Sequence, residues 1–198
     1  MRVSDNKYEH DIRKHHLAKW MVSYGARTRT VTQWTGLPRG RVQALSRRYH
    51  NKVGDHRRRG ISPFQTAFFA KSQLLESETL AFTFIACELG VVPDVAVPEA
   101  RRDLPGLVRG ERLQAAYELY LALVPDARIS LERAILLIIE FAEGQNLSLR
   151  RCRTCPLPMV IERVGVQHDQ CPACRDLRRT TAESQRNAHA ADQAHCKD

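Results

Sequence analysis

The residues best suited to chemistry are four cysteines in the C-terminal part of the chain. Cys152 and Cys155 are separated by two residues, as are Cys171 and Cys174, and fifteen residues lie between the two pairs. Each short loop can present two thiolates to one ion from the same side, and two such loops complete the tetrahedral shell of a structural zinc. The spacing therefore predicts one structural Zn²⁺ per chain, bound by all four cysteines.

Other uses of the cysteines stay open at this point. Two disulfides would suit a secreted protein, but the first residues lack the apolar stretch of a secretory signal, so we expect a reducing cytoplasm. A catalytic zinc normally keeps one position for water, whereas four thiolates close the shell. An iron–sulfur cluster also accepts four cysteines, and His168 could replace one of them. We interpret Cys87 as a core residue and Cys196 as incidental.

The segment that carries these cysteines is short and poor in large apolar residues. Residues 150–176 therefore form a zinc-binding module in which the metal supplies stability that a core would otherwise provide. The gap between the cysteine pairs suits a small hairpin. Residues 177–198 are polar and lack hydrophobic periodicity, and we expect a disordered tail there.

Positive charge is concentrated at the other end of the chain. Lys and Arg number 31 against 22 Asp and Glu, a formal net charge of +9, and residues 1–60 hold 15 of the basic and 4 of the acidic residues. A basic end on an acidic body is typical of proteins that bind nucleic acid, although a basic face that is only solvated has the same composition. No apolar run approaches the ~18 residues needed to cross a bilayer, so we expect no membrane partner.

Within residues 1–60, positions 28–47 have the plan of a helix-turn-helix. A helix over 27–35 and a second helix from Pro38 flank Gly36, at a turn where a positive φ is often required. The second helix would direct outward side chains that contact phosphates and base edges in a major groove, namely Arg39, Arg41, Gln43 and Arg47. A basic loop with Arg57, Arg58 and Arg59 could hold phosphate. A basic three-helix unit without a DNA-binding role would show the same pattern.

Residues 61–149 form the helical core and partner-binding region. Periodicity predicts helices over 12–24, 62–89, 113–124 and 131–142, with a loop over 91–110. The run from Ala134 to Ile139 is apolar nearly all round and needs cover from its own domain or another subunit. The sequence thus predicts a mainly α-helical bundle with an N-terminal helix-turn-helix-like unit and a small four-cysteine zinc module.

The order of these motifs resembles the flagellar transcriptional activator FlhC family. The similarity covers roughly residues 12–175 and is carried by Tyr24-Gly-Ala-Arg27, Thr35-Gly-Leu-Pro-Arg-Gly-Arg-Val42, Ser62-Pro-Phe64, Tyr117-x-x-Tyr120-Leu121 and the zinc cysteines. The resemblance implies a bacterial activator that works with FlhD in a heterohexamer of two FlhC and four FlhD chains. It also implies binding to double-stranded DNA at flagellar promoters and recruitment of RNA polymerase.

Three functions follow from these patterns. The first is promoter DNA binding and transcription activation with a partner protein, without enzyme activity. The alternative is a zinc-containing protein-interaction scaffold that does not bind DNA directly. A zinc-dependent nucleic-acid enzyme is a third, but the sequence has no phosphate-cradling glycine loop, no nucleophile elbow and no Asp/Glu/His cluster beside the cysteines.

Overall fold

The computed structural model describes residues 5–49, 73–92, 106–163 and 169–195. These residues form a mainly helical fold, as the sequence predicts, with one two-stranded hairpin near the C-terminal end. The elements in chain order are α1 (Asp5–Ser23), α2 (Thr28–Thr35), α3 (Arg39–Tyr49), α5 (Gln73–Glu88), α6 (Leu107–Leu123), α7 (Leu131–Glu143), β1 (Leu147–Arg151), β2 (Pro158–Glu162) and α8 (Pro172–His195).

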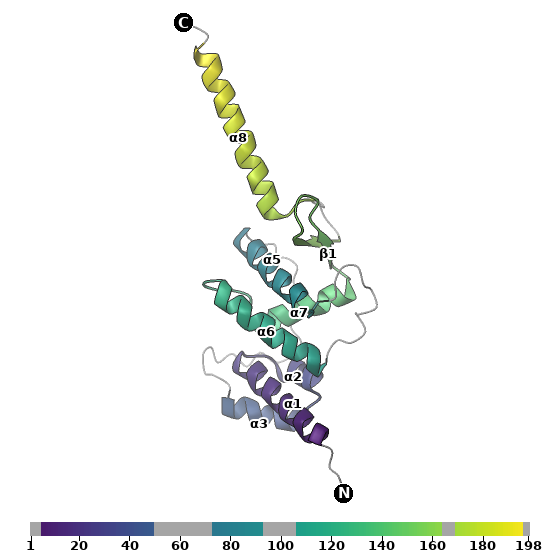
Figure 1. The fold of residues 1–198 in the computed structure, drawn as a ribbon. Helices are drawn as coiled ribbons and strands as arrows, with labels where there is room; N and C mark the ends of the chain where they lie inside the picture. Colours follow the sequence, from purple (N-terminus) through teal and green to yellow (C-terminus); the bar gives the residue numbers. More distant parts are fainter. Residues whose placement is uncertain (1–4, 50–72, 93–105, 164–168, 196–198) are drawn as a thin grey trace.

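The elements are stacked along one direction (Figure 1). Helices α1, α2 and α3 gather at the N-terminal end, and α6 lies between them and the pair α5 and α7. The hairpin and α8 follow at the opposite end, where α8 extends away from the body. One hydrophobic core runs from Leu17 to Leu147, so the described parts of regions 1–60 and 61–149 share a single core. A second, smaller cluster surrounds the cysteines.

Glycines end the first two helices where the sequence predicts. Gly25 follows α1 with φ 77°, and Gly36 follows α2 with φ 68°, values in the left-handed region that other residues rarely adopt. Val31, Trp34 and Val42 are buried where α2 and α3 pack. The helix-turn-helix interpretation stays a prediction, because other short helix pairs joined by a glycine turn bury such residues too.

Helix α6 has apolar residues on its buried face and on part of its exposed face. Its inner face is buried against α1, α2 and α5 through residues such as Leu113, Tyr117 and Tyr120. Its outer face leaves Val108, Leu119 and Leu123 exposed at 57%, 42% and 63%. Helix α7, which we expected to need cover, obtains most of it within the chain, since all its apolar residues are buried or half-buried. Among the described residues, α6 thus carries a group of three exposed large apolar side chains on one face.

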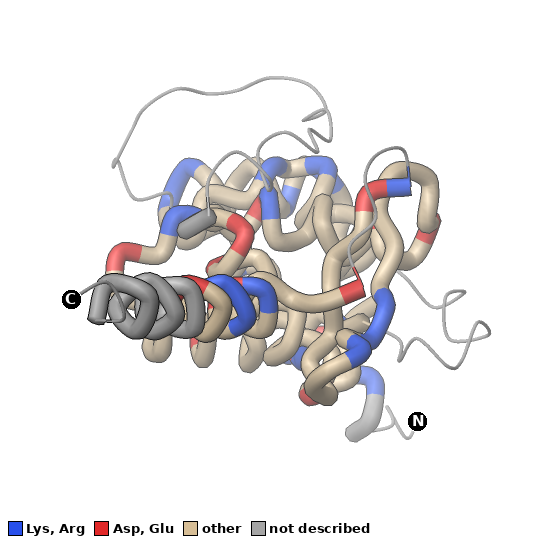
Figure 2. Tube along the Cα trace, turned by 90° about the horizontal axis from the view of Figure 1, so that it is seen from above, with Lys and Arg blue, Asp and Glu red and all other residues tan. Residues whose placement is uncertain are grey.

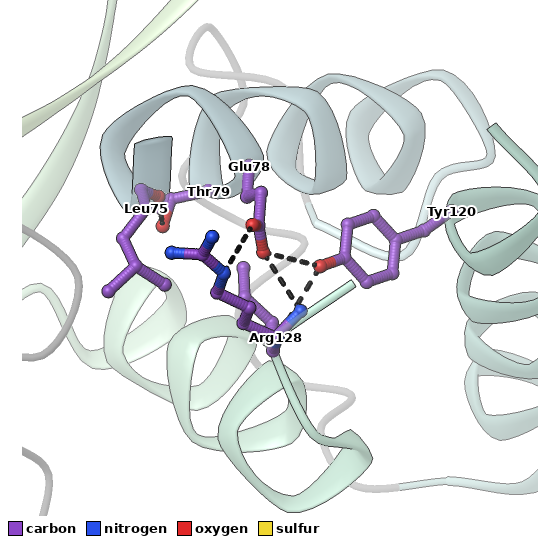
Figure 3. A network of polar contacts seen from close by, with 6 residues as sticks. Leu75, Glu78, Thr79, Tyr120 and Arg128 are labelled. Atoms are coloured by element: carbon purple, nitrogen blue, oxygen red, sulfur yellow. Dashed lines mark hydrogen bonds and ion pairs between the residues drawn. The ribbon is translucent and has the colours of Figure 1, made fainter. Parts of the chain in front are cut away.

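A carboxylate pins the connection between α6 and α7 to α5 (Figure 3). Glu78 accepts hydrogen bonds from the Tyr120 hydroxyl at 3.1 Å and from the Arg128 backbone N–H at 3.0 Å. The Arg128 side chain adds an ion pair, with Nε 3.7 Å from Glu78 Oε1. Because the Glu78 side chain is only 11% exposed, these partners replace the water that burial removes.

The helix boundaries differ from expectation in three places. Helix α1 begins at Asp5 rather than Ile12, because its first turns are polar and show no apolar stripe. Helix α6 begins at Leu107, within the stretch expected to be a loop. The tail expected to be disordered over 177–198 is helical to His195, since α8 is rich in residues that favour helix without forming a core stripe. The expected helix start at Ser62 lies outside the described residues.

Candidate metal centre and candidate nucleic-acid surface

The four cysteines converge on one point. The sulfur atoms of Cys152, Cys155, Cys171 and Cys174 all lie within 4.8 Å of one another, and the Sγ atoms of Cys155 and Cys171 are 3.6 Å apart. Thiolates about 2.3 Å from a tetrahedral zinc lie about 3.8 Å from each other, so this spacing fits a four-coordinate ion. The group could therefore hold a metal ion with a shell closed by sulfur.

The hairpin positions the first cysteine pair differently from our expectation. Strands β1 and β2 pair antiparallel from Leu147 opposite Glu162 to Arg151 opposite Pro158, so they bracket the first pair rather than lying between the two pairs. The Cys152 N–H donates to the Leu157 carbonyl at 3.0 Å and closes the loop. The strand before Cys152 was missed because only Leu147 and Leu149 mark its alternation.

The second pair lies at the start of α8. Cys171 directly precedes the helix, and Cys174 lies in its first turn, so the two thiols share one side. The Cys171 backbone N–H donates to the Cys152 sulfur at 3.2 Å, and the Thr154 N–H donates to the same sulfur at 3.4 Å. Backbone groups from both halves of the centre thus stabilise a thiolate at Cys152.

The sulfurs differ in their tendency to ionise. Burial opposes ionisation of Cys152, but the backbone N–H groups of Cys171, Thr154 and Cys155 outweigh it and lower its pKa to about 6. Hydrogen bonding to the sulfurs of Cys171 and Cys155 raises the pKa of Cys174 to about 12. Without metal, Cys152 thus favours the thiolate and Cys174 keeps its proton, and a bound cation would displace that proton.

Two carboxylates attach this centre to the helical body. Buried Glu140 accepts hydrogen bonds from the backbone N–H groups of Asn146 and Leu147, where the chain leaves α7 and enters β1. Glu76 of α5 accepts from Arg175 of α8 at 2.7 Å. Leu80 of α5 also packs against the cysteine cluster. No local pattern predicts these contacts, because each joins residues on different elements.

The predicted DNA-binding residues divide into two groups. Arg39, Arg41, Gln43 and Arg47 all lie on α3 and are exposed, whereas Arg57, Arg58 and Arg59 lie outside the described residues. Neither α2 nor α3 contains an acidic residue. Figure 2 shows a further group of basic positions on the first turns of α8, where Arg178 and Arg179 are exposed.

Helix α1 adds residues to the α3 surface that sequence analysis missed. His15 Nε2 lies 3.3 Å from Arg41 Nη1. Lys19 Nζ lies 4.8 Å from the centre of the Tyr49 ring, and the Arg48 guanidinium carbon lies 5.5 Å from the same centre. We define the α1–α3 basic surface as His15, Lys19, Arg41, Arg48 and Tyr49. The periodicity of α1 alone could not reveal it, because the surface arises from packing between two helices.

A carboxylate on α7 fixes the start of α2. Arg27 precedes α2 without a side-chain cap, but Glu132 accepts from the Arg27 backbone N–H at 3.1 Å and from the Thr30 hydroxyl at 2.8 Å. Glu132 therefore binds the N–H of the N-cap residue, which is the bond that a Glu at N3 makes in a capping box. Glu132 thus ties α2 to α7.

Comparisons with known proteins add no family assignment, since the chain matches no family model and no curated protein. Among the described residues, no helix combines the length and the apolar character that a bilayer crossing requires.

Proposed function

We propose that this protein is a transcription activator that binds promoter DNA through α3 and acts with a FlhD-like partner. The observation that carries the proposal is the exposed face of α3, where Arg39, Arg41 and Arg47 project from a helix pair without any acidic residue. A surface of this kind attracts phosphates and offers donors to base edges. The motif order that resembles the FlhC family supports the same function.

In this proposal the basic residues have two tasks. Contacts with phosphates position the protein and make the affinity fall steeply with salt. Arg39, Arg41 and Gln43 would read bases, since Arg pairs with guanine and Gln with adenine. Recruitment of RNA polymerase would follow once the complex is bound at a promoter.

We also propose that the metal is zinc, with one ion per chain and a structural role. A shell closed by four sulfurs supports this role, because a catalytic zinc normally keeps a position for water. The reducing cytoplasm, where we propose the protein acts, keeps the thiols available. Elemental analysis of reduced protein should give about one zinc per chain, and Cys171→Ser should lower that content. Protein purified without any bound metal would overturn the assignment.

The exposed apolar residues of α6 support the proposal that the protein binds a partner subunit. Val108, Leu119 and Leu123 remain exposed on it, and exposed apolar patches often mark protein interfaces. The same observation favours the alternative, a zinc-containing interaction scaffold without direct DNA binding. Co-expression with a FlhD-like protein, followed by mass determination of the complex, tests the heterohexamer of two and four chains that the resemblance implies.

Titration of DNA separates the activator from the scaffold. We expect the protein with its partner to retard a promoter fragment, and Arg41→Ala to weaken that binding by about 1–3 kcal/mol. The matched control is Arg163→Ala, which removes an exposed arginine directly after β2 and should leave binding unchanged. A scaffold would retard no fragment, and equal binding by wild type and Arg41→Ala would remove α3 from the interface.

A further inference from the structure

The contact between His15 and Arg41 has a defined chemical direction. A guanidinium has only hydrogen-bond donors, so in this pair Arg41 Nη1 donates and His15 Nε2 accepts across 3.3 Å. The accepting nitrogen carries no proton, which places the ring proton of a neutral His15 on Nδ1. The contact therefore selects one tautomer of the histidine and one orientation of the arginine.

The two partners belong to rigid elements. His15 precedes the buried pair Leu17 and Ala18, which hold α1 in the core, and Arg41 precedes Val42, which is also fully buried. Helices α1 and α3 pack directly on each other. The acceptor is thus held at a fixed place beside the guanidinium at the end of a long, flexible side chain, so it can restrict that side chain before any ligand arrives.

The surroundings of this pair are basic. On the same α1–α3 basic surface, the charged groups of Lys19 and Arg48 both lie over the ring of Tyr49. A second cation close to Arg41 would serve phosphate attraction equally well. A neutral imidazole instead supplies an acceptor, and an acceptor is what an arginine needs for orientation.

We propose that His15 is a positioning residue for Arg41, which orients the guanidinium for base readout and so contributes to sequence specificity. The proposal rests on the proposed function. Side chains that are ordered before binding lose less conformational freedom on binding, and one rotamer-rich side chain accounts for roughly a two- to tenfold change in affinity. The effect should appear on the recognised sequence and be absent on random sequence, where only phosphates are contacted.

The test uses DNA selected from a random pool by the full-length wild-type protein with its partner, beside a scrambled fragment of equal length. His15→Ala should weaken binding to the selected fragment roughly two- to tenfold and leave binding to the scrambled fragment unchanged. His15→Gln should retain specificity, because its amide oxygen can accept from Arg41. The matched control is His16→Ala, an exposed neighbour on α1 that should have no effect.

A cycle of variants tests the route of the effect. If His15 acts through Arg41, His15→Ala should cause no further loss of specificity in an Arg41→Ala background. Equal losses on both fragments, additive losses in the cycle, or failure of His15→Gln to restore specificity would each overturn the proposal. Absence of wild-type binding to any DNA would instead refute the proposed function itself.

Nitrogen-15 NMR of the histidine rings gives a readout without DNA. At a pH where His15 is neutral, its Nε2 should carry no proton in the wild-type protein, and Arg41→Ala should shift the ring towards the other tautomer. A protonated Nε2 in the wild type would show that the contact does not form and would overturn the positioning role, whatever the protein binds.

Discussion

Replacing Gly110 with Ala tests whether α6 and α1 approach as closely as the structure shows. Gly110 lies on the buried face of α6, and a Cβ atom there would overlap Leu17 Cδ2 and lie 3.4 Å from Trp34 Cε3. Leu17 and Trp34 are each 1% exposed, so neither side chain can turn into solvent. The added methyl group must therefore displace packed atoms between the basic helices and the body.

The expected effect is the difference between two opposing contributions. Overpacking a core costs about 1–3 kcal/mol, whereas Ala is favoured over Gly inside a helix by about 0.5–1 kcal/mol. We expect Gly110→Ala to lower the free energy of unfolding by roughly 1–2 kcal/mol. The measurement is equilibrium unfolding in urea, followed by circular dichroism at constant zinc.

The matched control is Gly40→Ala in α3, where a Cβ would meet nothing within 4 Å. This substitution should raise the free energy of unfolding by up to about 1 kcal/mol, so the two variants should differ in sign. In a Leu17→Ala background the space near Gly110 opens, and Gly110→Ala should then cost little or stabilise. Stabilisation by Gly110→Ala in the wild-type background would refute the close approach of α6 to α1.

Three further predictions follow from named contacts. Glu132→Ala leaves the Arg27 N–H and the Thr30 hydroxyl without their acceptor, so the free energy of unfolding in urea should fall by about 1–3 kcal/mol. Glu118→Ala on the exposed side of α6 should leave that free energy almost unchanged, and equal losses in the two variants would contradict the role of Glu132. Glu140→Ala should speed amide hydrogen exchange at Asn146 and Leu147, and unchanged exchange would mean that its bonds do not hold the hairpin. Burial raises the pKa of Tyr117 above its usual value and raises the pKa of Tyr120 to about 12. Because unfolded tyrosines ionise near pH 10, the free energy of unfolding should be highest below about pH 10 and should fall as the pH rises towards 12. Tyr120→Phe should reduce this loss of unfolding free energy at alkaline pH, and an unchanged loss would contradict the contribution of Tyr120.

Local signals in the sequence predicted much of the fold. The glycines after α1 and α2 and the apolar periodicity of α7 are determined by residues close in the chain, so the expected boundaries agree with Gly25, Gly36 and Leu131 within a few residues. The cysteine cluster was also predictable, because thiolate spacing directly reflects the geometry of a shared ion. The four sulfurs do come together.

Contacts between elements that are distant in the chain could not be predicted from local sequence patterns. His15 carries no signal in its own helix, and its role appears only because α1 packs on α3 beside Arg41. Glu132 accepts the N–H of the N-cap residue Arg27 from a position more than one hundred residues away in the chain. Helix α8 was missed for a different reason, since a polar helix that leaves the body lacks the hydrophobic stripe on which periodicity depends.

The acidic residues of the body acquire a meaning that composition could not provide. Glu78, Glu132 and Glu140 each accept backbone N–H groups at the junction of two elements, and Glu76 pairs with Arg175. These carboxylates are therefore engaged in holding α2, α5, α7, the hairpin and α8 together. These carboxylates lie at internal junctions. Neither α2 nor α3 contains an acidic residue, so no carboxylate on these two helices neutralises the arginines of α3. The charge division along the chain thus separates carboxylates that hold elements together from an exposed basic face on α3, and basic faces of this kind attract polyanions in general.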